Sequence, residues 1–171
     1  MLPDAVPAPD DVLRAFALPG DVVGYEAVPG GWGFAHLDRV RFGDLDAMRH
    51  LNNVAFLGYF ESARIAYITT LIPSHRPTDP EGDDFGLIFA EAHISYRAPG
   101  FYDDGIRTLV RIADVRRSSF RVEFRMEATG DDRLLAEGWG ALVGYDYAAG
   151  RSKPLPEGLV TTLEAEVARL A

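Results

Sequence analysis

The stretch RFGDLDAMRHLNNVAFLGYFESARIAYITTL, residues 41–71, decides how the rest of the chain is arranged. It opens with a polar segment in which Asp44 and Asp46 accompany a glycine, a histidine and two asparagines, a composition typical of a turn. Asn52 or Asn53 is a suitable N-cap, because its side-chain oxygen can accept from the free N–H groups of a first helical turn. A helix is therefore predicted to follow.

The predicted helix, residues 53–71, is almost entirely apolar. Its only formally charged side chains are Glu61 and Arg64, and most of the others are Val, Ala, Phe, Leu, Tyr and Ile. A helix of this composition has to be covered on most sides. The rest of the chain is therefore expected to wrap around it.

The start of this helix is where chemistry is expected. Unpaired N–H groups and the positive end of the helix dipole stabilise developing negative charge, such as a carbonyl oxygen that becomes an oxyanion. Asp46, seven residues before Asn53, could attack that carbonyl or orient a water molecule to do so. The alternative is that Asp44 and Asp46 only end a strand and begin a turn, and residue types alone favour this alternative.

In this stretch Asp44 and Asp46 are followed in order by His50, the Asn52-Asn53 pair and the helix residues Tyr59, Phe60 and Glu61. This order resembles the hotdog-fold acyl-CoA thioesterases of the 4-hydroxybenzoyl-CoA thioesterase type. That resemblance implies that Asp46 is the catalytic carboxylate and that a backbone N–H near Asn53 polarises the thioester carbonyl. Asp44 is expected to be structural, with its side chain hydrogen-bonded to the backbone of the turn. Arg49 departs from the family pattern, which commonly has glycine there, and Phe56 stands where many members have tyrosine. The matching residues are Asp44, Asp46, Ala47, Met48, His50, Asn52, Asn53, Phe56, Tyr59, Phe60 and Glu61.

Two further residues are candidates for the reaction. His50 is expected either to donate to the substrate or to orient Asp46; the equal alternative is that it satisfies carbonyl groups of the turn. Glu61 is the one acid of the helix, and a second branch of hotdog thioesterases uses a helix carboxylate. The alternative for Glu61, which we favour, is an ion pair with Arg64 three residues later.

Several strands are predicted on either side of the helix. Residues 120–129, FRVEFRMEAT, alternate most clearly, with charged side chains on one face that must meet water or a partner. The short turns at 99–104 and 130–132 predict antiparallel neighbours, and Gly138 and Gly140 predict a bulge or a close backbone approach. The other predicted segments are a strand at 35–42 with Leu37, Val40 and Phe42 as its apolar residues, a solvated loop at 72–84, strands at 86–98, 105–115 and 134–147, and a helix at 155–171.

This order predicts an α+β fold, in which a curved antiparallel sheet wraps around one long central helix. It agrees with the hotdog fold that the resemblance implies. The hotdog domain is assigned to residues 36–160, with residues 161–171 as its C-terminal helix and residues 1–35 as an N-terminal extension holding a short helix and a turn. A curved sheet around one helix leaves an edge and a face uncovered, which predicts a homodimer or a dimer of dimers.

Composition limits the function. The 171 residues carry a formal net charge of −9, which argues against nucleic-acid binding, and an anionic ligand would need a local basic patch. There is no cysteine, no metal-ligand spacing among the four histidines and no apolar stretch that predicts a membrane span or a signal peptide, so a cytoplasmic protein without metal or cofactor is expected. Candidate contacts to acyl-CoA are Arg116, Arg117, Ser118, Ser119, Arg151, Lys153, Phe56 and Tyr59.

The expected function is hydrolysis of an acyl-CoA thioester to the free acid and coenzyme A. Alternatives stay open: a non-catalytic hotdog module that binds acyl-CoA or only dimerises, and a thioesterase acting on acyl carrier protein. The acidic composition counts mildly against the carrier protein, which is itself usually acidic. A hydratase would need an Asp and a His on either side of a double bond, which the Asn-Asn cap fits less well.

Overall fold

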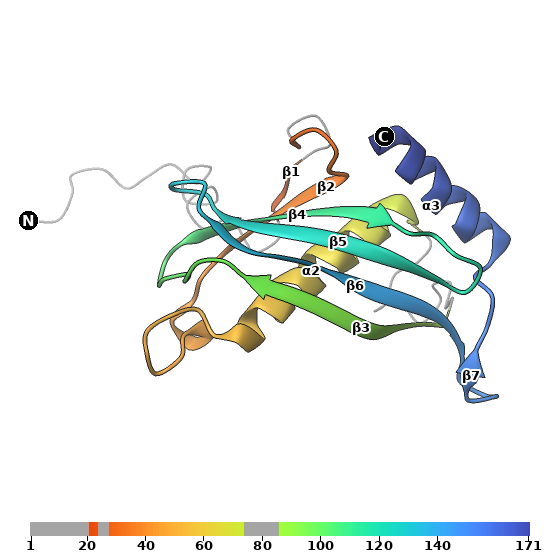
Figure 1. Ribbon diagram of the computed structural model, residues 1–171, viewed down its shortest axis with the longest axis horizontal. Coiled ribbons are helices and arrows are strands. Elements are labelled where there is room, and N and C mark those ends of the chain that lie inside the picture. The colour runs from red at the N-terminus through yellow and green to blue at the C-terminus, as the bar shows by residue number, and fades with distance from the viewer. Residues whose placement is uncertain (1–20, 24–27, 74–85) are drawn as a thin grey trace, which may run out of the picture.

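The computed structural model describes residues 21–23, 28–73 and 86–171. These residues form a curved antiparallel sheet wrapped around one long helix, with a second helix at one end (Figure 1), which confirms the predicted hotdog fold. The short helix predicted in the N-terminal extension, and most of the loop 72–84, lie outside the described residues. In chain order the elements are β1 (Asp21–Val23), β2 (Phe34–Arg39), a 3-10 helix (Phe42–Asp44), α2 (Asn53–Leu71), β3 (Leu87–Tyr96), β4 (Gly105–Ala113), β5 (Ser119–Ala128), β6 (Leu134–Asp146), β7 (Arg151–Ser152) and α3 (Glu157–Leu170).

The strand order of the sheet is β1-β2-β4-β5-β6-β3, with β7 paired to the end of β6. The short turn between β5 and β6 joins antiparallel neighbours, as predicted. The prediction that β3 and β4 are neighbours is wrong, because β5 and β6 lie between them. The chain between β3 and β4 instead runs past the start of α2, where the Leu51 N–H donates to the Gly100 carbonyl at 2.8 Å. β3 is thereby left at an edge of the sheet.

The core lies between the concave face of the sheet and α2. The predicted apolar face of β5 is confirmed, since Phe120, Val122, Phe124 and Met126 are at most 1% exposed. Phe60 of α2 stacks on Phe124 with ring centroids 4.3 Å apart. This packing fixes the helix across the middle of the sheet.

α2 has the predicted bounds and Asn52 as its N-cap. One side of the helix stays open, however: Val54 is 73% exposed, Leu57 38% and Ile65 37%. The neighbouring side packs on β3, where the Phe56 ring meets Tyr96 edge-on with centroids 5.2 Å apart. The open side of α2 and the edge strand β3 are therefore adjacent.

β2 differs from its prediction. The strand ends at Arg39, and Phe42 belongs to a 3-10 helix and is 81% exposed instead of contributing to an apolar strand face. The inward positions of β2 include His36 and Asp38, whose side chains are 6% and 3% exposed and approach to 3.1 Å. Strand pairing places His36 opposite Thr108 of β4, which is fully buried, so polar side chains occupy part of the concave face.

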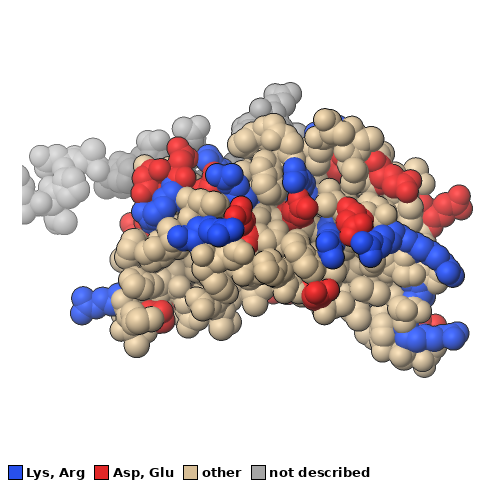
Figure 2. Space-filling model, viewed as in Figure 1, with Lys and Arg blue, Asp and Glu red and all other residues tan. Residues whose placement is uncertain are grey.

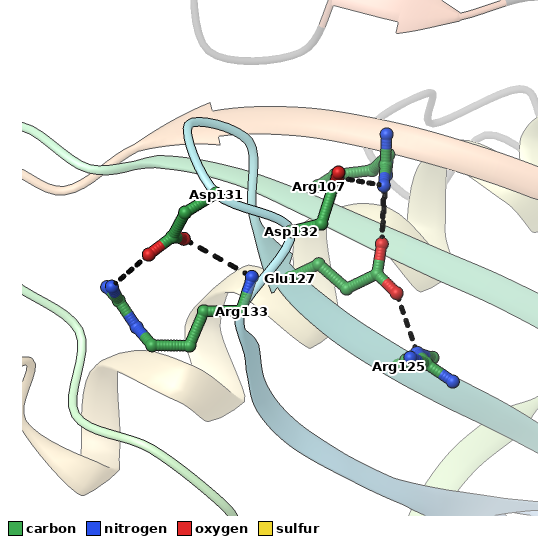
Figure 3. Close-up of polar contacts among 6 residues, drawn as sticks. All are labelled: Arg107, Arg125, Glu127, Asp131, Asp132 and Arg133. Carbon is green, nitrogen blue, oxygen red and sulfur yellow. Dashed lines mark hydrogen bonds and ion pairs between the residues drawn. The ribbon is translucent and has the colours of Figure 1, made fainter.

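The convex face of the sheet is charged, as the alternation of β5 predicted. Figure 2 shows Lys and Arg interspersed with Asp and Glu over this face. Glu127 of β5 accepts from Arg107 of β4 at 2.6 Å and from Arg125 at 2.7 Å, and Arg107 also contacts Asp132 (Figure 3). The hydrogen bond to Glu127 raises the pKa of Arg107 more than burial lowers it, so this pKa lies above the ordinary value.

Two glycines of β6 bring β3 and β6 together. A Cβ on Gly138 would lie 1.9 Å from the carbonyl oxygen of His93, and one on Gly140 would meet the rings of Phe89 and Phe60. The predicted close backbone approach is therefore confirmed. A register shift does occur between Phe89 and Glu91 on β3, opposite β6.

α3 closes the end of the core opposite the start of α2. Leu159 and Leu163 are buried in the core, and the Tyr67 hydroxyl of α2 donates to the buried Glu166 carboxylate. Burial alone would raise the pKa of Glu166, but hydrogen bonds from Arg169 and Tyr67 lower it below its ordinary value. Neither α2 nor α3 is long and apolar enough to cross a membrane.

Candidate active site

The turn between β2 and α2 is closed at its base by backbone contacts. The Asn52 N–H donates to the Asp44 carbonyl at 2.8 Å, and Leu45 and Leu51 form an isolated antiparallel bridge. Inside this bridge, the Asp46 N–H donates to the His50 carbonyl at 2.8 Å. The turn is therefore a compact loop whose two ends are β2 and the N-terminus of α2.

The Asp46 carboxylate is held by one oxygen only. Its Oδ1 accepts from the backbone N–H groups of Met48 at 2.8 Å and His50 at 3.1 Å. Among the residues that the structure describes, none donates to Oδ2, and the side chain is half-buried. One oxygen thus orients the carboxylate while the other remains available for chemistry.

The start of α2 offers one free backbone donor. The Asn52 side chain caps the helix by accepting from the Val54 N–H at 3.0 Å, and its carbonyl accepts from the Ala55 N–H. Within the described ranges, no group accepts from the Asn53 N–H. Because this amide lies at the positive end of the helix dipole, it can bind a partly negative oxygen.

Asp44 and Tyr59 fasten the turn to the helix. The Asp44 Oδ2 accepts from the Tyr59 hydroxyl at 2.5 Å and from the Arg41 N–H at 2.9 Å. Burial, and then the hydrogen bond to Asp44, raise the pKa of Tyr59 well above its ordinary value. The phenol therefore stays a hydrogen-bond donor. Asp44 is structural here, in agreement with the sequence analysis.

His50 and Glu61 have other contacts. The His50 ring lies edge-on to Phe101 with centroids 5.6 Å apart, and no hydrogen bond joins that ring to Asp46. Glu61 is 65% exposed and lies 3.7 Å from Arg64, which is the predicted ion pair. Burial, only partly offset by Glu61, lowers the pKa of Arg64. The structure thus brings Asp46 and the Asn53 amide to one turn, and leaves the side chains of His50 and Glu61 without a polar contact to Asp46.

Residues 40–163 match the family model described as the thioesterase-like superfamily. The chain belongs to the thioesterase-like superfamily. A thioesterase-superfamily protein from Jannaschia sp. CCS1 is 27% identical, with a TM-score of 0.69 over 98% of both chains. A Thermus thermophilus thioesterase, solved in complex with coenzyme A and zinc, is 32% identical with a TM-score of 0.69, over 81% of this chain and 97% of that one. No curated protein matches.

A Synechocystis 1,4-dihydroxy-2-naphthoyl-CoA thioesterase has the same fold, with a TM-score of 0.63 over 80% of this chain and 96% of that one. At 18% identity this similarity concerns the fold alone. Among the described residues of this thioesterase-like chain, no three His, Asp or Glu side chains are grouped to hold a metal ion.

The candidate coenzyme A contacts of this thioesterase-like chain gather at one end of the sheet. The Leu155 N–H donates to the Arg117 carbonyl at 2.9 Å, and the Gly144 N–H to the Ser118 carbonyl at 2.9 Å. The turn between β4 and β5 therefore lies beside the segment that follows β7. Arg116 forms two hydrogen bonds with Asp114, whereas Arg151 and Lys153 lie in and beside the exposed β7.

These contacts lie far from the turn that holds Asp46 in the same chain. Figure 1 shows the start of α2 at one end of the long axis and β7 at the other. Phe56 and Tyr59, the candidates for the acyl pocket, are only 2% and 3% exposed and belong to the core. One thioesterase-like chain alone therefore does not bring all the candidates together.

Residues of the chain between β3 and β4 support the turn, and they were not predicted from the sequence. Phe101 contacts His50, and Gly100 accepts from Leu51. Tyr102, 61% exposed, lies edge-on to the exposed Phe42 with centroids 6.3 Å apart. These residues lie about fifty positions after the turn in the sequence. Their contact with the turn could therefore have been predicted only from the strand order.

Proposed function

We propose that this protein is an acyl-CoA thioesterase of the 4-hydroxybenzoyl-CoA thioesterase type, with Asp46 as its catalytic carboxylate. The observation that carries the proposal is that two groups occur together at the start of α2. One is the Asp46 carboxylate, which is oriented through Oδ1 and free at Oδ2, and the other is the Asn53 N–H, from which no described group accepts. The thioester carbonyl oxygen accepts from the Asn53 N–H, so that the charge developing on that oxygen is stabilised. In the proposed pose, Asp46 approaches the carbonyl carbon from the turn that precedes α2.

Two routes use this geometry. In the first, an Asp46 oxygen adds to the carbonyl carbon to give a tetrahedral intermediate, and the C–S bond of that intermediate then breaks to release coenzyme A as a thiolate. The mixed anhydride that remains between Asp46 and the acyl group is hydrolysed by water to the free acid and the Asp46 carboxylate. In the second, Asp46 takes a proton from a water molecule whose oxygen attacks the carbonyl carbon, and the C–S bond breaks to give the acid and coenzyme A. Both routes need the Asp46 Oδ2 to be deprotonated and accessible.

A homodimer is part of the proposal. The edge strand β3 and the open side of α2 are adjacent, and pairing two β3 strands antiparallel covers both. It also sets the β7 end of one chain beside the catalytic turn of the other, because the two sites lie at opposite ends of each chain (Figure 1). Basic residues such as Arg151 and Lys153 then reach the phosphates of a coenzyme A whose thioester lies at the partner chain's turn. The relative from Thermus thermophilus, solved with coenzyme A, supports this ligand.

The test is Asp46→Asn, assayed against a panel of acyl-CoA esters. The asparagine keeps an oxygen that accepts from Met48 and His50, so the turn should persist while kcat falls about 10²- to 10⁴-fold. Asp146→Asn is a matched control, since the Asp146 Oδ1 accepts from two turn amides, of Ala148 and Ala149, both at 3.0 Å. Most activity left in Asp46→Asn would refute the mechanism. Binding of acyl-CoA by a wild-type protein that hydrolyses none would favour the non-catalytic module instead.

A further inference from the structure

We propose that Tyr59 and Asp44 form a positioning pair that fixes Asp46 relative to the Asn53 amide. This inference rests on the proposed function. It assigns Tyr59 a role in orienting the reacting groups in place of the acyl-pocket role expected from the sequence.

Tyr59 joins three elements through one hydroxyl group. It lies on α2 and is 3% exposed, so its ring is fixed by the core. The hydroxyl donates to the Asp44 Oδ2 at 2.5 Å and approaches the Arg39 carbonyl, at the end of β2, at 3.3 Å. The helix, the strand and the turn therefore meet at one part-buried hydroxyl group.

Asp44 connects the Tyr59 hydroxyl to both proposed reacting groups. Its backbone carbonyl accepts from the Asn52 N–H at 2.8 Å, immediately before the free Asn53 amide. In the other direction along the chain, Asp46 follows only two residues later. The Arg41 N–H, at 2.9 Å, and the Arg41 Nε, at 3.6 Å, complete the surroundings of the Asp44 carboxylate. A shift of Asp44 consequently changes the distance between the attacking carboxylate and the amide that holds the carbonyl.

The same helix contains a matched tyrosine whose carboxylate partner lies elsewhere. Tyr67, eight residues later, is fully buried and also donates to a buried carboxylate, that of Glu166 on α3. Eight residues correspond to a rise of about 12 Å along the helix. Losing either hydroxyl removes a side-chain hydrogen bond of a buried tyrosine, but the bond made by Tyr59 is the one that leads to the catalytic turn.

The experiment compares Tyr59→Phe with Tyr67→Phe in steady-state hydrolysis of an acyl-CoA and in thermal unfolding. Because a displacement of about 1 Å can cost about 100-fold in rate, Tyr59→Phe should lower kcat about 10- to 100-fold with KM within about threefold. Tyr67→Phe should lower Tm comparably but keep kcat within about threefold. A kcat of Tyr59→Phe close to wild type, or an equal kcat loss in Tyr67→Phe, would overturn the proposal.

Asp44 variants supply the second comparison. Asp44→Asn keeps an oxygen that accepts from both Tyr59 and Arg41, so it should retain most of kcat, whereas Asp44→Ala should lose as much as Tyr59→Phe. Equal losses in both Asp44 variants would contradict a purely positional role.

Hydrogen exchange gives a measurement that does not depend on activity. The amides of Met48 and His50, which donate to Asp46, should exchange faster in Tyr59→Phe and unchanged in Tyr67→Phe. If the wild type hydrolyses no acyl-CoA, the proposed function fails while this exchange still reports whether Tyr59 holds the turn. Unchanged exchange in Tyr59→Phe would refute the positioning pair directly.

Discussion

Arg49 lies in the turn between β2 and α2, with a backbone conformation that favours glycine. Its φ is +64°, and its N–H donates to the Asp46 carbonyl at 3.0 Å. In this region the Cβ of an L residue crowds the carbonyl oxygen, at a cost of about 1–2 kcal/mol. The glycine that related thioesterases commonly have at this position avoids that cost, so the arginine is accommodated with backbone strain.

Arg49→Gly should therefore stabilise the protein. We expect the free energy of unfolding to rise by about 0.5–1 kcal/mol, since the relief of strain exceeds the extra entropy of an unfolded glycine. Urea denaturation measures this change. Arg41→Gly is the control, because Arg41 has a φ of −89° and glycine there should only destabilise. A loss of stability in Arg49→Gly would show that the arginine side chain contributes more than its backbone costs.

Single residues were predictable where their partners are close in sequence. The Asn52 cap and the Asp46 turn depend on amides within four residues, so composition and order were enough to predict them. The contact between Tyr59 and Asp44 spans fifteen positions and depends on how the turn folds back on the helix. The side chains of His36 and Asp38 are polar and yet point into the core. No hydropathy pattern in the sequence indicates this orientation.

The bounds of helix α2 were predictable from the sequence, but which of its sides the sheet covers was not. A cap followed by nineteen mostly apolar residues fixes where the helix begins and ends. Which side stays open depends on the neighbouring β3. Arg64, whose side chain is 10% exposed, lies on the side that packs on β3, with its guanidinium 4.7 Å from the centroid of the Phe89 ring. Its Nε has no hydrogen-bond partner among the described residues.

Arg64 should stabilise α2 by packing more than by charge. Arg64→Ala should cost about 2 kcal/mol of unfolding free energy, because it removes the side chain that lies over Phe89. Arg64→Met, which keeps an unbranched apolar chain, should stay within about 1 kcal/mol of wild type, since the Arg64 guanidinium is poorly paired. Chemical denaturation of both variants and of Glu61→Gln measures this. A Met variant as unstable as the Ala variant would show that the charge matters.

The order of the strands in the whole sheet could not be predicted from the sequence. Period-two patterns predicted β3 to β6 within a few residues, yet they carry no information about which strands pair. The short connection from β3 to β4 suggested neighbours, whereas the sheet curves enough for that connection to pass α2 instead. The two halves of the candidate site consequently proved to lie at opposite ends of one chain.

Dimer formation should be necessary for activity. Leu57, 38% exposed on the open side of α2, should become buried against the second copy. Leu57→Arg places an unpaired charge there, so sedimentation velocity should show a shift from dimer to monomer together with a loss of hydrolysis. Thr161→Arg, on the exposed side of α3, should leave both unchanged. An active monomeric wild type would contradict the shared site.

The two buried tyrosines have one further consequence for how the molecule can move. Tyr59 pins one part of α2 to the turn before it, and Tyr67 pins a later part to α3. A helix held at both points cannot move along its own axis without breaking one of these two hydrogen bonds. For the proposed acyl-CoA thioesterase, we therefore expect room for acyl groups of different length to come from side-chain rearrangement along the edge of β3. The distance between Asp46 and the Asn53 amide should then be the same for every substrate.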